Sequence, residues 1–244
     1  YKGTRKPLDE ELIVQFPIVR EYLDAAGIKR YEQEGYEADD IIGSMAKCCK
    51  DVQTTILTSD RDLLQLIDSS THVLLMKKGL SEMELMDEQN LLDTYGITPS
   101  QVIDMKGLMG DTADNIPGVA GVGEKTALRL LNQYSTVENV YAHIDEVKGK
   151  LKEKLEKDKE NAFMSLELAT IYTKMELPFS LNDCEFTGIQ DDVNAFYEKY
   201  EMRSLVNRTK QTKEEKWPLK EVDHFEFENM DDVMVMPVCT QEPY

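Results

Sequence analysis

Residues 106–132 read KGLMGDTADNIPGVAGVGEKTALRLLN, and this stretch combines two kinds of chemistry. The first is acidic: Asp111 and Asp114 are three residues apart. One turn of helix at this point would place both carboxylates on the same face. We therefore expect the pair to act together.

The second kind of chemistry lies in the glycine-rich half of the stretch. Pro117, Gly118, Gly121 and Gly123 break the chain into tight turns, and residues 124–131 then have the pattern of a helix. A glycine-rich turn that leads into a helix presents unpaired backbone N–H groups, which can hold a phosphate. Carboxylates beside such a turn suggest a divalent metal and a nucleic acid together. An ordinary helix–turn–helix connection with a solvated acidic turn is the alternative, and glycine-rich loops are too common for spacing alone to decide.

The composition is typical of a soluble globular protein. The chain has 244 residues, of which 41% are hydrophobic and 31% charged, and this length supports one large domain or two small ones. No apolar run approaches the length that spans a bilayer, so we expect no membrane contact. The four cysteines, two of them adjacent, have no metal-ligand spacing. Reduced thiols in a cytoplasm are the interpretation we favour.

The net charge of −19 argues at first against a nucleic-acid partner. Its distribution weakens the objection, since residues 213–244 contain nine acidic and three basic side chains. Seven of the other acids fall in three clusters, and carboxylates that bind divalent ions no longer repel phosphate. The charge therefore excludes little by itself.

The hydrophobic pattern predicts an α/β part followed by a helical part. An amphipathic helix over 9–26 ends at Gly27, where glycine suits a C-cap. We predict strands at 28–34, 52–58, 72–77 and 82–86, and helices at 87–95, 98–108, 124–131, 135–144, 145–157, 161–174 and 191–202. From residue 209 the pattern becomes that of a linker.

Three acidic clusters lie apart in the sequence: Glu37 with Asp39 and Asp40, Asp60 with Asp62, and Asp111 with Asp114. The second follows a strand that reads as buried, and open α/β sheets place their sites at such strand ends. The first also suits simple capping of a helix that begins there. No histidine or cysteine accompanies the clusters, which makes zinc a poor candidate and favours magnesium or manganese. Carboxylates in this number fit a two-metal phosphodiesterase.

The motifs together carry a family resemblance. YKGTR, GYEADDIIG, ILTSDRDLLQL and GLMGDTADNIPGVAGVGEKTALRLL follow in this order, as in bacterial 5′ nucleases of the flap endonuclease superfamily. More narrowly, residues 1–208 resemble the 5′→3′ exonuclease domain of bacterial DNA polymerases I. The resemblance implies a Rossmann-like (PIN-like) parallel sheet within 1–92, with the base of a helical arch at 1–7. It also implies an all-helical subdomain over 93–208 with a helix–three-turn–helix motif, and a linker with the start of another domain over 209–244.

The resemblance also assigns site residues. It implies two Mg²⁺ or Mn²⁺ ions whose ligands, direct or through water, are Glu37, Asp39, Asp40, Asp60, Asp62, Asp111 and Asp114. It implies DNA contacts from the helix–three-turn–helix motif at Gly121, Gly123, Lys125 and Thr126, where relatives also hold K⁺. Tyr1 would stack on a base of the 5′ strand, while Lys2 and Arg5 would neutralise the scissile phosphate.

The implied function is a structure-selective 5′ nuclease that acts on 5′ flaps, nicked duplexes and primer–templates, as a cytoplasmic monomer joined to polymerase domains. The family begins with a strand ending in an aspartate, and supplies a second aspartate before the arch. Neither precedes Tyr1 here, so we expect this chain alone to be weakly active or inactive. A stand-alone short exonuclease, a non-catalytic DNA-binding module and a metal-dependent ribonuclease remain the alternatives.

Overall fold

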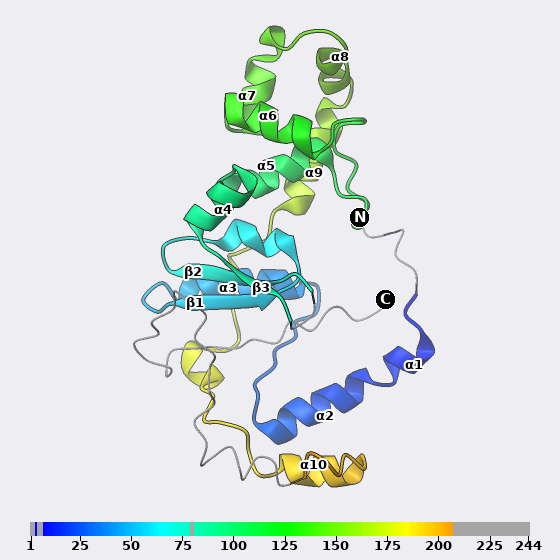
Figure 1. Cartoon of the computed structure of the whole chain (residues 1–244), viewed down its shortest axis with the longest axis vertical. Helices are drawn as coiled ribbons and strands as arrows, with labels where there is room; N and C mark the ends of the chain where they lie inside the picture. Colours follow the sequence, from blue (N-terminus) through cyan, green and yellow to red (C-terminus); the bar gives the residue numbers. More distant parts are fainter. Residues whose placement is uncertain (1–2, 4–6, 79–80, 207–244) are drawn as a thin grey trace. The chain divides into compact units, whose positions relative to one another are not determined.

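The computed structural model describes residues 3, 7–78 and 81–206 (Figure 1). They form two compact units, one built on Gly35–Leu177 and the other on Pro7–Glu34 together with 178–206. The predictions for Tyr1, Lys2, Arg5 and the segment 209–244 lie outside the described residues. Within the described part of the chain, no helix is both long enough and apolar enough to cross a bilayer.

A three-stranded sheet forms the centre of the first unit, in the order β1-β2-β3. Strands β1 (Thr54–Thr58) and β2 (Thr71–Met76) are parallel, whereas β3 (Met83–Met86) runs antiparallel to β2. The predicted α/β class is confirmed, with a sheet that is mixed because the short connection from β2 to β3 allows a hairpin and no crossover. Alternate residues of β1 are buried, as the pleat requires.

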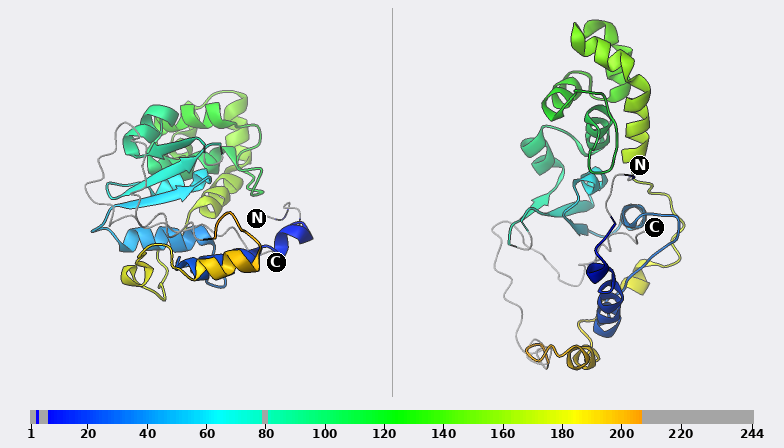
Figure 2. Two further views of the ribbon diagram at one scale, coloured as in Figure 1. Left: turned by 60° about the horizontal axis from the view of Figure 1, so that its bottom comes forward. Right: turned by 90° about the vertical axis from the view of Figure 1, so that its right-hand side faces the viewer.

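Helix α3 (Ala38–Cys48) lies along one face of this sheet (Figure 2). Its apolar residues Ile41, Ile42 and Met45 are buried, as are Ile56 of β1 and Val73 of β2. The 3₁₀ helix η1 (Arg61–Leu66) follows β1 directly and buries three leucines. These contacts fix the end of β1, where the second acidic cluster begins.

The helical part of the first unit lies beyond the sheet, with α6, α7 and α8 farthest from it (Figure 1). Its elements are α4 (Glu88–Tyr95), α5 (Pro99–Met109), α6 (Glu124–Tyr134), α7 (Val137–Ala142), η2 (Ile144–Glu146), α8 (Lys150–Lys157) and α9 (Lys159–Ala169). Thr98 and Gln101 form a capping box at the start of α5, with Pro99 in the first turn. The core contains Leu108, Val119, Leu131 and Leu155.

Two of the predicted helices in this part are too long. The helix expected over 145–157 begins only at Lys150, because Gly149 adopts φ 66° and η2 precedes it. The helix expected over 161–174 ends at Ala169, and the chain then crosses α3 in an extended form. There Ser44 Oγ donates to the carbonyl of Tyr172 at 3.3 Å and accepts from the backbone N of Met175 at 3.1 Å.

The second unit contains α1 (Glu10–Ile13), α2 (Phe16–Ala26), η3 (Leu181–Cys184) and α10 (Val193–Lys199). The single helix predicted over 9–26 is interrupted because Pro17, in the first turn of α2, cannot donate to the preceding turn. The strand predicted over 28–34 is wrong: these residues form none. Arg30 there donates to Asp24 instead, at 3.0 Å. Helices α2 and α10 share a core of Ala26, Val193, Phe196 and Tyr197.

Candidate active site

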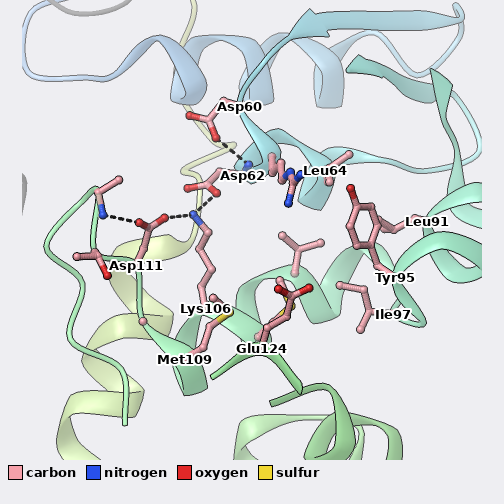
Figure 3. Close-up of a pocket in the computed structure, with 16 residues that line it drawn as sticks. Asp60, Asp62, Leu64, Leu91, Tyr95, Ile97, Lys106, Met109, Asp111 and Glu124 are labelled. Atoms are coloured by element: carbon pink, nitrogen blue, oxygen red, sulfur yellow. Dashed lines mark hydrogen bonds and ion pairs between the residues drawn. The ribbon is translucent and has the colours of Figure 1, made fainter. Parts of the chain in front are cut away.

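The chain turns sharply where β1 ends. The backbone N of Asp60 donates to Thr58 Oγ1 at 2.9 Å, and Asp60 Oδ1 accepts from the backbone N of Asp62, also at 2.9 Å. Asp60 is therefore the N-cap of η1. This tight turn leaves Asp60 exposed and directs the Asp62 side chain toward the end of α5 (Figure 3).

Asp111 and Asp114 lie in a turn, and the helical turn that we predicted for them is wrong. A backbone bridge joins Asp111 and Ile116, with N–O distances of 2.9 and 2.8 Å. Asp111 Oδ1 accepts from the backbone N of Ala113 at 2.8 Å and of Asp114 at 3.4 Å. The side chain of Asp111 thus stabilises the turn that places it beside Asp114.

Three of the predicted ligands come together in this way. Asp62, Asp111 and Asp114 each offer one carboxylate oxygen within 4.8 Å of the others. In the part of the chain that the structure describes, this is the only group of three or more such side chains at metal-ligand spacing. All of its donors are carboxylate oxygens, the ligands that Mg²⁺ and Mn²⁺ prefer. The residues present therefore fit a hard divalent ion.

A lysine lies within this acidic group. Lys106 Nζ, from the last turn of α5, forms ion pairs with Asp62 and with Asp111, the latter at 2.5 Å (Figure 3). Burial raises the pKa of Asp62 above its ordinary value even though Lys106 opposes the change. Burial would also raise the pKa of Asp111, but hydrogen bonds from Lys106 and the backbone of Ala113 bring it below its ordinary value. Burial would lower the pKa of Lys106, and the two carboxylates raise it.

The acidic group opens into a cavity of about 450 Å³. Asp60, Asp62, Lys106 and Asp111 line one side of it, and Glu124 at the start of α6 also faces it (Figure 3). The remaining wall is largely apolar and contains Leu64, Leu91, Tyr95, Ile97, Val102, Met105 and Met109. The carboxylates therefore face a space that is large enough to admit part of a ligand.

The first acidic cluster occupies the start of α3. Asp40 Oδ2 accepts from the backbone N of Glu37 at 3.1 Å and so closes a capping box. Asp40 Oδ1 accepts from the backbone N of Tyr172 at 2.9 Å. The bond to Glu37 is the helix capping that one interpretation of this cluster expected, and the bond to Tyr172 is an additional tertiary contact. Across the described residues, Glu37, Asp39, Asp40 and Asp60 do not belong to a group of three at ligand spacing, so their role as ligands stays a prediction.

The glycine-rich loop, residues 118–123, is hydrogen-bonded to side chains of α8, of α9 and of the residue between these two helices. The backbone N of Gly118 donates to buried Ser165 Oγ at 2.9 Å, and that of Ala120 donates to Asp158 Oδ2 at 2.9 Å. Lys154 Nζ donates to the carbonyl of Gly121 at 3.2 Å. The loop is thus tied to its support at three successive points.

The predicted phosphate contacts lie at the outer side of this loop and at the start of α6. Gly123 is the N-cap, in an extended conformation and without a side-chain cap. Gly121, Gly123 and Lys125 are exposed, and Thr126 is half-buried. The first backbone N–H groups of a helix have no intrahelical partner. The geometry is compatible with an anion at this position, while the contacts themselves stay a prediction.

Sequence reasoning missed the residues that support both parts of the site. One of them is Lys106, the first residue of the stretch 106–132, for which the sequence motifs predict no role. Its spacing from Asp111 gave no usable signal, because residues five apart do not share a face of a helix and the pairing with Asp62 is a tertiary contact. Ser165, Asp158 and Lys154 also gave no signal, because their contacts with the loop span 33 to 47 residues of sequence.

Two family models match the chain, one after the other. The model described as "5'-3' exonuclease, N-terminal resolvase-like domain" matches residues 1–96. The model described as "5'-3' exonuclease, C-terminal SAM fold" matches residues 97–192. The first covers the sheet and the second covers the glycine-rich loop with the helices that hold it.

Curated relatives agree with the models. DNA polymerase I of Bacillus subtilis (strain 168) is 48% identical over 212 residues, which make up 85% of this chain and 24% of that protein. DNA polymerase I of Bacillus caldotenax is 43% identical over 224 residues, or 90% of this chain and 26% of that protein. The chain spans about a quarter of the length of these relatives.

Solved structures share the fold at lower identity. The D15 protein of T5, co-crystallised with metal ions, has a TM-score of 0.58 and 22% identity over 83% of this chain and 76% of that one. The catalytic core of Rad2 in complex with a DNA substrate has a TM-score of 0.55 and 18% identity over 83% of this chain and 70% of that one. The two models match 1–96 and 97–192 in succession, and the curated relatives agree with them, so the chain belongs to the 5′-3′ exonuclease family and is similar to about a quarter of the length of bacterial DNA polymerases I.

Proposed function

We propose that this chain hydrolyses phosphodiester bonds at 5′ ends and 5′ flaps of DNA, or of RNA in a hybrid, as the 5′→3′ exonuclease part of a DNA polymerase I in replication and repair. The observation that carries the proposal is the group of Asp62, Asp111 and Asp114 within 4.8 Å of one another, of which Asp62 and Asp111 line a cavity. Membership of the 5′-3′ exonuclease family suggests the reaction, which is phosphodiester hydrolysis. The acidic group is the site at which we propose that this reaction takes place.

The cofactors in this proposal are two Mg²⁺ or Mn²⁺ ions. Bound divalent ions in such a site activate water and offset the charge of the scissile phosphate. Asp62, Asp111 and Asp114 would hold one ion. Residues Glu37, Asp39, Asp40 and Asp60 would serve the other directly or through water. Support comes from a T5 5'-exonuclease structure described with bound divalent zinc and from the all-oxygen donor set here.

The glycine-rich loop and the start of α6 would hold the duplex. In this proposal the backbone N–H groups of Gly121 and Gly123, the ammonium of Lys125 and the hydroxyl of Thr126 contact phosphates, with K⁺ at the same motif. Contacts of this kind position a duplex and read no sequence. A T5 flap endonuclease in complex with DNA and metal ions, with a TM-score of 0.57, supports a DNA partner.

The acidic turn and the loop are parts of one continuous segment. Gly110 ends α5 at φ 71°, and a Cβ on Gly118 would lie 2.2 Å from the backbone N of Gly110. The two backbones therefore touch, which fixes the acidic turn against the first residues of the loop. In the proposed function this contact sets the distance between the point where DNA is held and the point where it is cut.

The remaining assignments rest on sequence motifs. Tyr1 would stack on a base of the 5′ strand, while Lys2 and Arg5 would neutralise the scissile phosphate as catalytic residues. We assign 1–92 to the metal-binding core, 93–208 to the DNA-binding subdomain and 209–244 to a linker and the start of the next domain. The protein in this proposal is a monomer of the bacterial cytoplasm, covalently joined to polymerase domains.

A substrate panel tests the proposal. The chain is incubated with Mg²⁺ and three labelled substrates: a 5′-flap duplex, a nicked duplex and a single strand. We expect short 5′ products from the flap and the nicked duplex, none without Mg²⁺, and little from the single strand. The comparison between the three substrates, with and without Mg²⁺, decides. Equal cleavage of all three, or products that form without a divalent ion, would contradict the proposal.

A further inference from the structure

The acidic group contains a cation that belongs to the protein. The ammonium of Lys106 lies between the carboxylates of Asp62 and Asp111, and it contacts both (Figure 3). Only 14% of the Lys106 side chain and 14% of the Asp62 side chain are exposed, against 22% for Asp111. Water therefore has limited access to these charges, and the ion pairs are screened less than pairs on an open surface.

Carboxylates at this spacing repel one another when nothing lies between them. Asp62, Asp111 and Asp114 offer oxygens within 4.8 Å, and a partly buried position strengthens their repulsion. The single charge of Lys106 offsets part of it. The same two oxygens that Lys106 contacts, Asp62 Oδ1 and Asp111 Oδ2, belong to the carboxylates that would serve as ligands. An ammonium and a divalent ion that share these oxygens would also repel each other.

We propose that Lys106 is an internal counter-ion that keeps Asp62 and Asp111 at ligand spacing and that a divalent ion displaces when it binds. This inference rests on the proposed function, because it takes the acidic group to be a metal site. Lys106 acts through the carboxylates and is a positioning residue. Its occupation of the site also makes it a competitor, so the protein's own lysine sets how tightly the ion is bound.

The surroundings of Lys106 allow such an exchange. Lysine has a flexible four-carbon stem, and its ammonium can leave one partner for another without a change in the backbone. Lys106 itself lines the cavity of about 450 Å³ that adjoins the carboxylates. The apolar wall formed by residues such as Met105 and Met109 can cover the stem of the displaced side chain. The ammonium would then point toward the open part of the cavity.

A permanent structural ion pair makes the opposite prediction. If Lys106 only supports the turn, its removal disorders Asp62 and Asp111 and weakens metal binding. If Lys106 competes with the ion, its removal frees both carboxylates and strengthens metal binding. The sign of the change in affinity therefore separates the two roles.

The test measures Mn²⁺ affinity of the full chain by titration calorimetry, with electron paramagnetic resonance of free Mn²⁺ as a second readout. Lys106→Met and Lys106→Gln should bind Mn²⁺ about tenfold more tightly, the scale on which groups beside a metal site change its affinity. Lys106→Arg should bind it severalfold more weakly, because a guanidinium grips two carboxylates in a fixed geometry. Without metal, the Met and Gln variants should unfold at a lower temperature than the wild type.

Lys47→Met is the matched control. Lys47 Nζ pairs with Asp68 Oδ2 at 2.6 Å in the same unit, and neither residue belongs to the acidic group. Its Mn²⁺ affinity should equal that of the wild type. Unchanged or weaker binding in the Met and Gln variants overturns the inference. If the Met and Gln variants fail to fold, the Lys106→Arg variant decides. Mn²⁺ binding by Lys106→Arg that is as tight as in the wild type would overturn the inference. No binding by any of the proteins overturns both the inference and the proposed metal site.

Discussion

Asp104 Oδ1 accepts a hydrogen bond of 2.7 Å from the backbone N of Val137, and this bond joins the middle of α5 to the start of α7. Asp104 is only 7% exposed. Burial raises its pKa to about 6, although the hydrogen bond from Val137 acts in the other direction. A carboxylate thus sits where a neutral group would be favoured, inside the subdomain that carries the glycine-rich loop.

Asp104→Asn should therefore stabilise the protein above pH 6. The folded state holds the Asp104 proton to about pH 6, whereas the unfolded chain releases it near its ordinary pKa of about 4. The wild type accordingly loses stability as the pH rises through this window, by on the order of 3 kcal/mol. Asparagine keeps an oxygen for Val137 and carries no charge.

Urea unfolding at pH 4.5, 6 and 8 checks this prediction. The variant should gain stability over the wild type as the pH rises, with little difference at pH 4.5. Asp93→Asn, an exposed residue of α4, provides a control that should show no such trend. A difference between Asp104→Asn and the wild type that stays constant with pH would rule out the explanation.

Ser165→Ala should weaken the support of the loop. It removes the acceptor for the buried backbone N–H of Gly118, and a buried donor without a partner costs about 1–3 kcal/mol. We expect a loss of that size in the free energy of unfolding, together with weaker binding to duplex DNA. The exposed Ser100→Ala should leave both measurements within error. Normal stability of Ser165→Ala would mean that the Gly118 bond contributes little.

Gly118→Ala should be more damaging. Gly118 adopts φ 57°, and a Cβ there would lie within 2.6 Å of backbone atoms of Met109 and Gly110. Both the conformation and the space exclude a side chain, so we expect a loss of more than about 2 kcal/mol. Gly123→Ala meets no atom within 4 Å and serves as the comparison, with a much smaller change in melting temperature. Equal melting temperatures for the two variants would contradict the close packing.

Lys125→Ala should weaken duplex binding equally for all sequences. Lys125 is exposed near the start of α6, where one phosphate contact would be lost. Affinity should fall severalfold, and the dependence of log K on log salt should decrease by about 1. Lys150→Ala, an exposed lysine of α8, is the control. A loss that depends on the base sequence would argue against a phosphate contact at Lys125.

Local rules predicted most of the elements in the first unit. Strands β1 and β2 could be predicted because each is a short run of β-branched and apolar residues, which is a recognisable pattern for a buried strand. The ends of α4 and the start of α5 followed from Gly96 and from Thr98 with Pro99, which act through their own backbone geometry. Such signals are local, so a single sequence contains them.

Errors arose where tertiary contacts or turn chemistry decided the outcome. Asp111 was expected in a helix, but its side chain hydrogen-bonds to the following backbone and stabilises a turn. The strand predicted over 28–34 is wrong, and among the described residues the only sheet is formed by β1, β2 and β3 of the other unit. Burial patterns alone cannot tell an extended segment from a strand, since a strand also needs a partner.

The acidic residues of the candidate site could be identified from the sequence, but their arrangement in space could not. The sequence shows that three acidic clusters exist. Only the folded structure shows that Asp62 lies close to Asp111 and Asp114. The sequence also could not show that Asp40 uses both oxygens to hold Glu37 and Tyr172. The position of Lys106 between two carboxylates depends on how α5 packs against η1, which no local pattern specifies.

The most direct test of the proposed active site compares Asp111→Asn with Asp145→Asn on a 5′-flap substrate over a range of Mg²⁺ concentrations. Asp145 is a suitable control because its side chain is 93% exposed and pairs with Lys152 away from the acidic group. We predict that Asp145→Asn cleaves at the rate of the wild type and that Asp111→Asn loses at least about 100-fold, the scale of a lost metal ligand or transition-state contact. Equal Mg²⁺-dependent cleavage by the two variants would contradict the assignment of the active site to Asp62, Asp111 and Asp114.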